Sequence, residues 1–143
     1  MRVSKRLIIY GIFLFFTFSA QGILGQTLSI SIDRPEKDAN VSQRSMVSGK
    51  VSDVTLMVYI AIRPMATSEF WIQEIPNISK DGTWAQYCYF GEPAVGRGEP
   101  YEIIAFASRN RTLLKPGQKI QSPLPDNPGI LVKSDIVRVI RNK

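Results

Sequence analysis

Residues 70–90 constrain the fold most, because two runs rich in aromatic and β-branched side chains flank one strong turn signal. The turn is Asp81-Gly82. Glycine tolerates the positive φ of a tight turn, and an aspartate side chain can bond its own backbone. The runs on either side, residues 70–75 and 83–90, have the composition of strands. We therefore expect a β-hairpin here, with residues 76–82 as its wide connection.

Five further runs have the two-residue period or the apolar composition of strands, and no window outside the N-terminal leader has a convincing helical period. They are residues 26–32, 46–51, 56–62, 101–108 and 131–140. Residues 109–129 hold four prolines and are expected to be a mobile or extended segment that crosses between sheets. Seven short strands predict an all-β fold, a two-sheet immunoglobulin-like sandwich, with residues 23–143 as its single domain.

Residues 1–22 have the three parts of a secretory signal peptide. Three basic residues lie within the first six positions, residues 7–18 form an apolar run, and small residues precede a possible cleavage after Gly22. The apolar run is short for a membrane span. We interpret this segment as a signal peptide, the alternative being an uncleaved N-terminal anchor. The expected location is extracytoplasmic (secreted, periplasmic or at the cell surface), with no membrane span after signal removal.

Composition argues against several classes of function. The net charge of +6 falls to +3 without the three basic residues of the leader, so a nucleic-acid partner is not expected. The chain has no histidine, which removes the commonest general base and zinc ligand. Its single cysteine, Cys88, excludes an intramolecular disulfide and is expected to be a buried small hydrophobe, the alternative being a bond to another chain. We expect no enzyme, no cofactor and no metal.

Carboxylates are the remaining catalytic candidates. A glycosidase needs two of them on either side of a cleft, and Glu69 with Glu74 or Glu99 with Glu102 could be nominated. Such residues are more typical of solvated loops and strands. The enzymatic hypothesis therefore ranks last.

Strand alternation predicts which aromatic side chains face outward. On the strand after the turn, an inward Trp84 leaves Tyr87 and Tyr89 outward. On the most apolar strand, the same alternation leaves Tyr59 and Arg63 outward. These four outward residues are the candidate binding residues, because an exposed tyrosine suits sugar stacking or protein contact. The alternative is that tyrosine serves here only as a good strand former.

Three Asn-x-Ser/Thr triplets begin at Asn40, Asn77 and Asn110. All three lie in or beside expected loops, as glycan acceptors must. They are possible glycosylation sites only if the host attaches such glycans.

Three short motifs bear on the fold. They are Val47-Ser48-Gly49, then Asp81-Gly82-Thr83-Trp84, then Gly98 followed by Tyr101-Glu102-Ile103-Ile104-Ala105. Over residues 28–140 the chain resembles the bacterial and archaeal immunoglobulin-like domains of secreted and cell-surface proteins. The resemblance implies a β-sandwich and little about function, because such sandwiches host many activities. This chain departs from the family in having one copy and a long proline-rich segment before its last strand.

The leading functional hypothesis is a secreted, non-enzymatic immunoglobulin-like module with a binding or structural role. Its partner would be a protein, a cell-surface polymer or a like subunit. The alternative is a carbohydrate-binding, lectin-like module in which exposed tyrosines stack on sugar rings.

Overall fold

The computed structural model describes residue 25 and residues 27–143, and this part of the chain contains ten strands. Seven of them have four or more residues: β1 (Ile30–Arg34), β3 (Arg44–Val51), β4 (Met57–Pro64), β5 (Glu69–Ile72), β6 (Thr83–Tyr89), β7 (Pro100–Ser108) and β10 (Val137–Arg141). Three are shorter: β2 (Asn40–Val41), β8 (Lys119–Gln121) and β9 (Val132–Lys133). The predicted signal peptide and its cleavage site lie outside the described residues.

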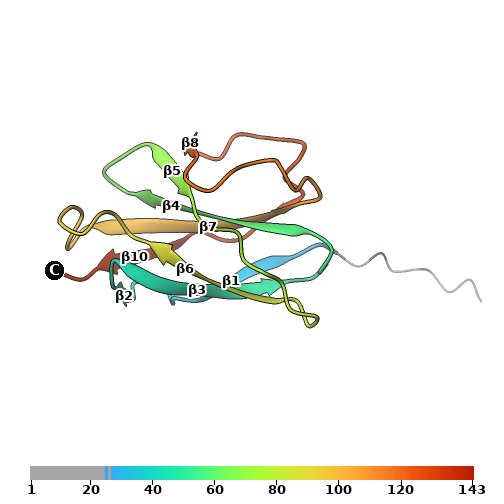
Figure 1. Ribbon diagram of the computed structural model, residues 1–143, viewed down its shortest axis with the longest axis horizontal. Helices are drawn as coiled ribbons and strands as arrows, with labels where there is room; N and C mark the ends of the chain where they lie inside the picture. Colours follow the sequence, from blue (N-terminus) through green and yellow to red (C-terminus); the bar gives the residue numbers. More distant parts are fainter. Residues whose placement is uncertain (1–24, 26) are drawn as a thin grey trace, which may run out of the picture.

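The strands form two sheets that pack face to face (Figure 1). The smaller sheet has the order β1-β3-β6, and the larger has the order β2-β10-β7-β4-β5-β8, with β9 also paired to β7. The chain crosses between sheets after β1, β2, β3, β5 and β6, which gives the Greek-key connectivity typical of immunoglobulin-like sandwiches. The prediction of an all-β, two-sheet sandwich is confirmed. Two short strands, β2 and β8, were not expected, and the run at 131–140 forms two strands, β9 and β10, where one was expected.

The predicted hairpin between residues 70–75 and 83–90 is wrong, because its two arms lie in different sheets. β5 pairs with β4 and β8, whereas β6 pairs with β3. The turn itself is present. Gly82 has a φ of 86°, and the Asp81 carboxylate accepts hydrogen bonds from the hydroxyl and the backbone N–H of Thr83, which lower the pKa of Asp81 below its ordinary value. Turn chemistry specifies a local chain reversal and leaves the longer-range pairing open.

The connection from β5 to β6 runs beside the free edge of β6 at both ends. The side-chain oxygen of Gln73 accepts a hydrogen bond from the backbone N–H of Tyr89 at 2.8 Å, and Ile78 forms a single bridge with Trp84. Between them Pro76 is buried and has no N–H to donate, so a continuous ladder cannot form. The segment therefore covers an edge strand without extending the sheet.

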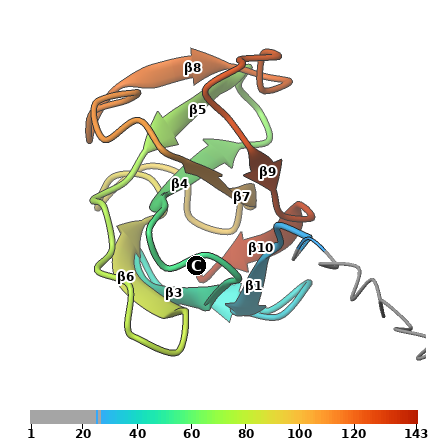
Figure 2. The same ribbon diagram turned by 90° about the vertical axis from the view of Figure 1, so that its right-hand side faces the viewer.

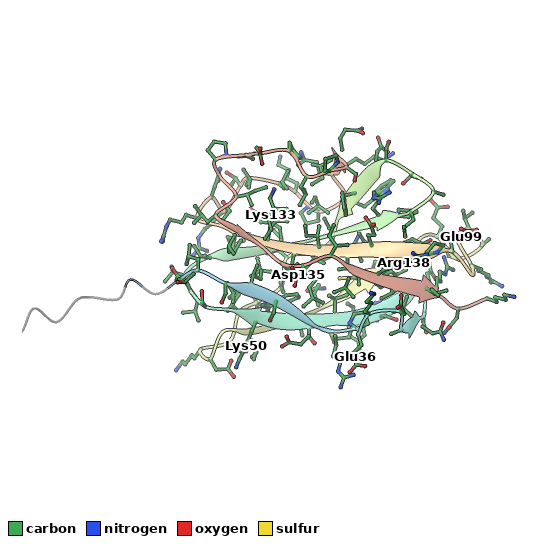
Figure 3. All side chains as sticks on the ribbon, turned by 180° about the vertical axis from the view of Figure 1, so that it is seen from behind. Glu36, Lys50, Glu99, Lys133, Asp135 and Arg138 are labelled. Carbon is green, nitrogen blue, oxygen red and sulfur yellow. The ribbon has the colours of Figure 1, made fainter. Side chains whose placement is uncertain are left out.

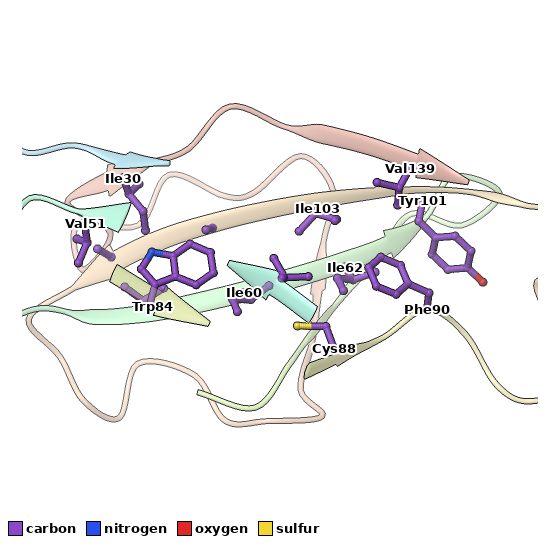
Figure 4. Close-up of a cluster of buried hydrophobic side chains, with 14 of the residues drawn as sticks. Ile30, Val51, Ile60, Ile62, Trp84, Cys88, Phe90, Tyr101, Ile103 and Val139 are labelled. Carbon is purple, nitrogen blue, oxygen red and sulfur yellow. The ribbon is translucent and has the colours of Figure 1, made fainter. Parts of the chain in front are cut away.

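The main hydrophobic core lies between the two sheets (Figure 4). On β6 and just after it, Trp84 is 2% exposed, and Cys88 and Phe90 are fully buried. Tyr87 and Tyr89 point to the other face and are 44% and 52% exposed. The predicted alternation on this strand and the predicted burial of Cys88 are both confirmed.

A second hydrophobic core covers the opposite face of the larger sheet. Residues 109–131 fold back over this face and add β8 beside β5 (Figure 2). Leu124 from this segment is buried against Tyr59 and Phe106, whose rings stack with centroids 5.5 Å apart. The predicted crossing of residues 109–129 between sheets is wrong. Their apolar side chains are spaced irregularly among prolines, so no strand or helix period reveals the covering role.

Candidate functional site

An open cleft of about 600 Å³ lies on one side of the sandwich. It exists because the two sheets differ in width. β6 is the last strand of the smaller sheet, whereas β5 and β8 lie beyond β4 in the larger sheet. The inner face of the larger sheet is therefore left partly uncovered, and Ile62 and Tyr101 line the cleft there. The β4–β5 and β6–β7 loops border it.

Two large aromatic side chains, Trp71 and Tyr89, line the cleft from opposite sheets. Trp71 pairs in register with Ile62, so its ring projects from the inner face of the larger sheet, but it remains 42% exposed. Tyr89 ends β6 and is 52% exposed. One cation already contacts the Trp71 ring, since Lys119 Nζ lies 4.3 Å from the ring centroid and 3.4 Å from the Glu69 carboxylate.

Gln73 fixes the spacing of these two walls. Its Oε1 accepts a hydrogen bond from the Tyr89 N–H at 2.8 Å, and its Nε2 donates to the Trp71 carbonyl at 3.2 Å. Only 9% of the residue is exposed. Both ends of this amide are therefore engaged with the backbone of the strands that carry the aromatic rings.

The β6–β7 loop is held by a buried arginine from the last strand. Arg141 is 4% exposed, and its guanidinium donates hydrogen bonds to four loop carbonyls at 2.6–3.2 Å. The acceptors are Phe90, Glu92, Pro93 and Val95. A planar, permanently charged group with five donors suits this arrangement. Sequence reasoning missed Arg141, because a single basic residue in a terminal strand carries no periodic signal.

Two glycines let the same loop approach the sheet closely. Gly91 and Gly96 have φ values of 76° and 88°, and a Cβ atom at either position would collide with the Tyr101 hydroxyl. That hydroxyl also lies 3.4 Å from the Gly96 carbonyl, to which it donates a hydrogen bond. The backbone of the β6–β7 loop, which lines the cleft, is thus held by Arg141 and by the Tyr101 hydroxyl.

Two acidic residues of this loop, Glu92 and Glu99, line the cleft. Neither takes part in an ion pair with a described residue. Among the described residues that line the cleft there is no lysine or arginine. Glu99 lies at the end of the sandwich from which the loop projects (Figure 3). The lining residues therefore carry a negative formal charge in a chain whose net charge is positive, while the buried Arg141 guanidinium contacts the backbone of the same loop.

Two of the predicted binding residues lie on the covered face of the larger sheet. The expected exposure of Tyr59 is wrong: it is fully buried, and its hydroxyl donates to the Asn110 carbonyl at 2.9 Å. Its side chain does point away from the main core, but residues 109–131 cover it. The Arg63 side chain is 14% exposed, pairs with Glu102 and donates to the Thr67 carbonyl at 2.7 Å. It stabilises the β4–β5 turn.

The other two predicted binding residues, Tyr87 and Tyr89, lie on the outer face of the smaller sheet, and their predicted exposure is confirmed. Arg44 lies over the Tyr87 ring at 4.0 Å from its centroid, and Met46 pairs with Tyr87 on β3. Of the four predicted residues only Tyr89 also lines the cleft. The structure thus does not bring the four together.

Trp71 is the cleft residue that the sequence was best placed to reveal. Phe70 and Ile72 are buried on one face of β5, so alternation places Trp71 on the other.

The two nominated carboxylate pairs are partly engaged in ion pairs, since Glu69 pairs with Lys119 and Glu102 pairs with Arg63.

The three possible glycan acceptors, Asn40, Asn77 and Asn110, are exposed. The Asn110 side chain accepts hydrogen bonds from the N–H and hydroxyl of Thr112, both at 3.0 Å.

Within residues 27–143 no three His, Cys, Asp or Glu side chains are grouped so as to hold a metal ion. Nor does this part contain a helix of the length and hydropathy that a membrane span requires. No protein-family model matches the chain, and no curated protein matches it.

Proposed function

We propose that the chain is an extracytoplasmic, non-enzymatic immunoglobulin-like binding module whose recognition surface is the cleft between Trp71 and Tyr89. The observation that carries the proposal is this mostly apolar cavity of about 600 Å³ with two half-exposed aromatic rings. Cavities of this size and character are the usual sites of ligand binding. Aromatic rings supply much of the affinity of such sites, because they bury a large apolar area with few rotatable bonds.

The rigid surroundings of the cleft support the same proposal. The hydrogen bonds of Arg141 and Gln73 fix its loop and its two aromatic walls before any ligand arrives. A preformed site loses less conformational entropy on binding. The partner would be a protein or a cell-surface polymer.

A variant that fills the cleft tests this proposal. Ala66 is exposed and lines the cleft, so Ala66→Trp should occupy it without disturbing the core. Val54→Trp adds the same side chain at an exposed turn before β4, at the opposite end of that strand from Ala66. It serves as the matched control. Binding to a glycan array or to a random peptide library should be lost in the first variant and kept in the second. Equal binding by both variants would refute the assignment of the surface.

The extracytoplasmic location rests on the leader and has its own test. Residues 1–25 fused to a reporter that is active only outside the cytoplasm should give signal. N-terminal sequencing of the mature protein should begin near Ile23. Recovery of the full-length chain in the membrane would support the anchor alternative.

Carbohydrate recognition by the tyrosines is the second candidate. Tyr87 and Tyr89 lie on one exposed face of β6, two positions apart. Arg44 covers one side of the Tyr87 ring, so a sugar on that face would have to displace Arg44 or stack on the other side of the ring. Sugar binding that survives Tyr87→Ala and Tyr89→Ala would exclude this surface.

A further inference from the structure

We propose that the cleft binds a segment of a partner protein that presents a lysine or arginine side chain beside an apolar one. This inference rests on the proposed binding function and specifies the chemistry of the ligand. Three features of the cleft carry it: two acids without an ion-pair partner among the described residues, one aromatic ring, Tyr89, that no cation of the described chain covers, and a lining that is otherwise mostly apolar.

Charge complementarity favours a cation at the cleft mouth. Glu92 and Glu99 line the cleft, have no ion-pair partner among residues 27–143, and face no lysine or arginine of the lining. The nearby cations are engaged elsewhere, since Arg141 donates to the loop carbonyls and Lys119 pairs with Glu69. The two carboxylates are therefore the charges that the described lining leaves free for a ligand. Opposite charges across an interface raise the association rate and select against acidic partners.

The aromatic walls of the cleft favour the same kind of ligand. Lys119 already lies over the Trp71 ring at 4.3 Å, and Arg44 over the Tyr87 ring at 4.0 Å. The Tyr89 ring has no such partner in the described part of the chain and is 52% exposed. A lysine or arginine of a ligand can therefore contact this ring while its charge faces Glu92 or Glu99.

The cleft lining favours a protein segment over a sugar. Ile62, Pro64 and Val95 contribute apolar surface, and the one lining amide, Gln73, already has backbone partners at both ends. Apart from the carboxylates of Glu92 and Glu99, sugar hydroxyls that left water for this cleft would find few hydrogen-bond partners, which costs binding free energy. An aliphatic or aromatic side chain meets no such penalty. A segment with a basic and an apolar residue side by side satisfies both the lining and the mouth.

Selection from a phage-displayed library of random twelve-residue peptides on the purified protein tests the inference. Enriched peptides should carry lysine or arginine within two positions of a large apolar residue, and should lose binding to Ala66→Trp. For a synthetic peptide from this set, the double variant Glu92→Gln, Glu99→Gln should weaken binding about three- to tenfold, with a smaller effect at high salt.

The matched control is the double variant Asp126→Asn, Asp135→Asn. It changes the net charge equally at two exposed positions that do not line the cleft, and Asp135 lies away from Glu99 (Figure 3). This control should keep the parent affinity. A loss of affinity equal to that of the cleft variant would overturn the inference, because it would reflect net charge alone.

The remaining outcomes separate the inference from the proposed function. Selection of neutral or acidic peptides that Ala66→Trp no longer binds would overturn the inference and leave the cleft as a binding site. If no peptide is selected but the protein binds glycans, and Ala66→Trp abolishes that binding, the inference is overturned and the cleft is a sugar-binding site. Peptides that bind Ala66→Trp as well as the parent would overturn both.

Discussion

Neighbouring side chains on β6 have opposite surroundings, which predicts opposite effects of substitution. The Trp84 ring is 2% exposed at one end of the main core (Figure 4), so Trp84→Ala should cost ~3–5 kcal/mol of the free energy of unfolding. A domain of this size has only about 5–15 kcal/mol in total. Tyr87→Ala, at a 44% exposed position, should change it by less than about 0.5 kcal/mol. Urea denaturation measures both, and a larger loss for Tyr87→Ala would show that the two faces are assigned in reverse.

The single thiol should be unreactive in the folded protein. Burial raises the pKa of Cys88 to about 12 from an ordinary value of 9.0. Iodoacetamide at pH 8 should therefore label the native protein far more slowly than the denatured one. Below pH 9 the thiol is protonated in both states, so it does not change the free energy of unfolding with pH. Between pH 9 and pH 12 the thiol ionises in the unfolded state first, and the free energy of unfolding should fall as the pH rises. Cys88→Ala should lack that alkaline loss, and rapid native labelling would contradict the buried assignment.

The two arginines of β10 offer a matched pair. Arg141 is buried against the β6–β7 loop, whereas Arg138 is exposed. Arg141→Gln leaves several loop carbonyls without their donors and should cost about 2–3 kcal/mol. It should also speed tryptic cleavage after Arg97, an exposed residue of that loop. Arg138→Gln should change neither stability nor cleavage. Equal effects of the two variants would refute the role of Arg141 in holding the β6–β7 loop.

Among the elements, the sequence predicts strands well both where one face meets solvent, as on β6, and where an apolar run is buried on both faces, as on β4 and β7. The alternation on β6 and the long apolar runs of β4 and β7 give strands within a few residues of those observed. Pairing was harder to predict. The turn at Asp81-Gly82 is as strong as expected, yet it closes only the Ile78–Trp84 bridge. Which strand lies beside which is decided by the packing of the two sheets, and a local turn carries no information about it.

The segment that covers the larger sheet supports an element-scale prediction. Leu124 is 9% exposed in the second core, whereas Leu131, from the same stretch of chain, is 40% exposed. Leu124→Ser should loosen residues 109–131 and raise their amide hydrogen exchange, while β3 and β6 keep their protection. Leu131→Ser should leave exchange unchanged. Faster exchange throughout both sheets in the first variant would show that this cover is not a separate unit of stability.

At the scale of the whole molecule, the candidate site follows from a difference in sheet width that no local pattern records. Trp71 is exposed only because the smaller sheet ends at β6, and Tyr59 is buried only because residues 109–131 fold over it. Alternation correctly gives the face on which each side chain lies. Whether that face is covered depends on elements distant in sequence, so the exposure of Tyr59 could not be predicted.

The two cores share their central strands, and this predicts cooperative unfolding of the sheets. β4 directs Val58 and Ile60 into the main core and Tyr59 into the second, so unfolding of β4 releases side chains of both cores, whereas opening of residues 109–131 alone does not. In Trp71→Phe, Trp84 is the one remaining tryptophan and reports on the main core. Its fluorescence and the far-ultraviolet circular dichroism of residues 23–143 should follow one urea transition, with a spectrum typical of β-structure. Two separated transitions, or a helix-rich spectrum, would contradict a sandwich built on strands common to both cores.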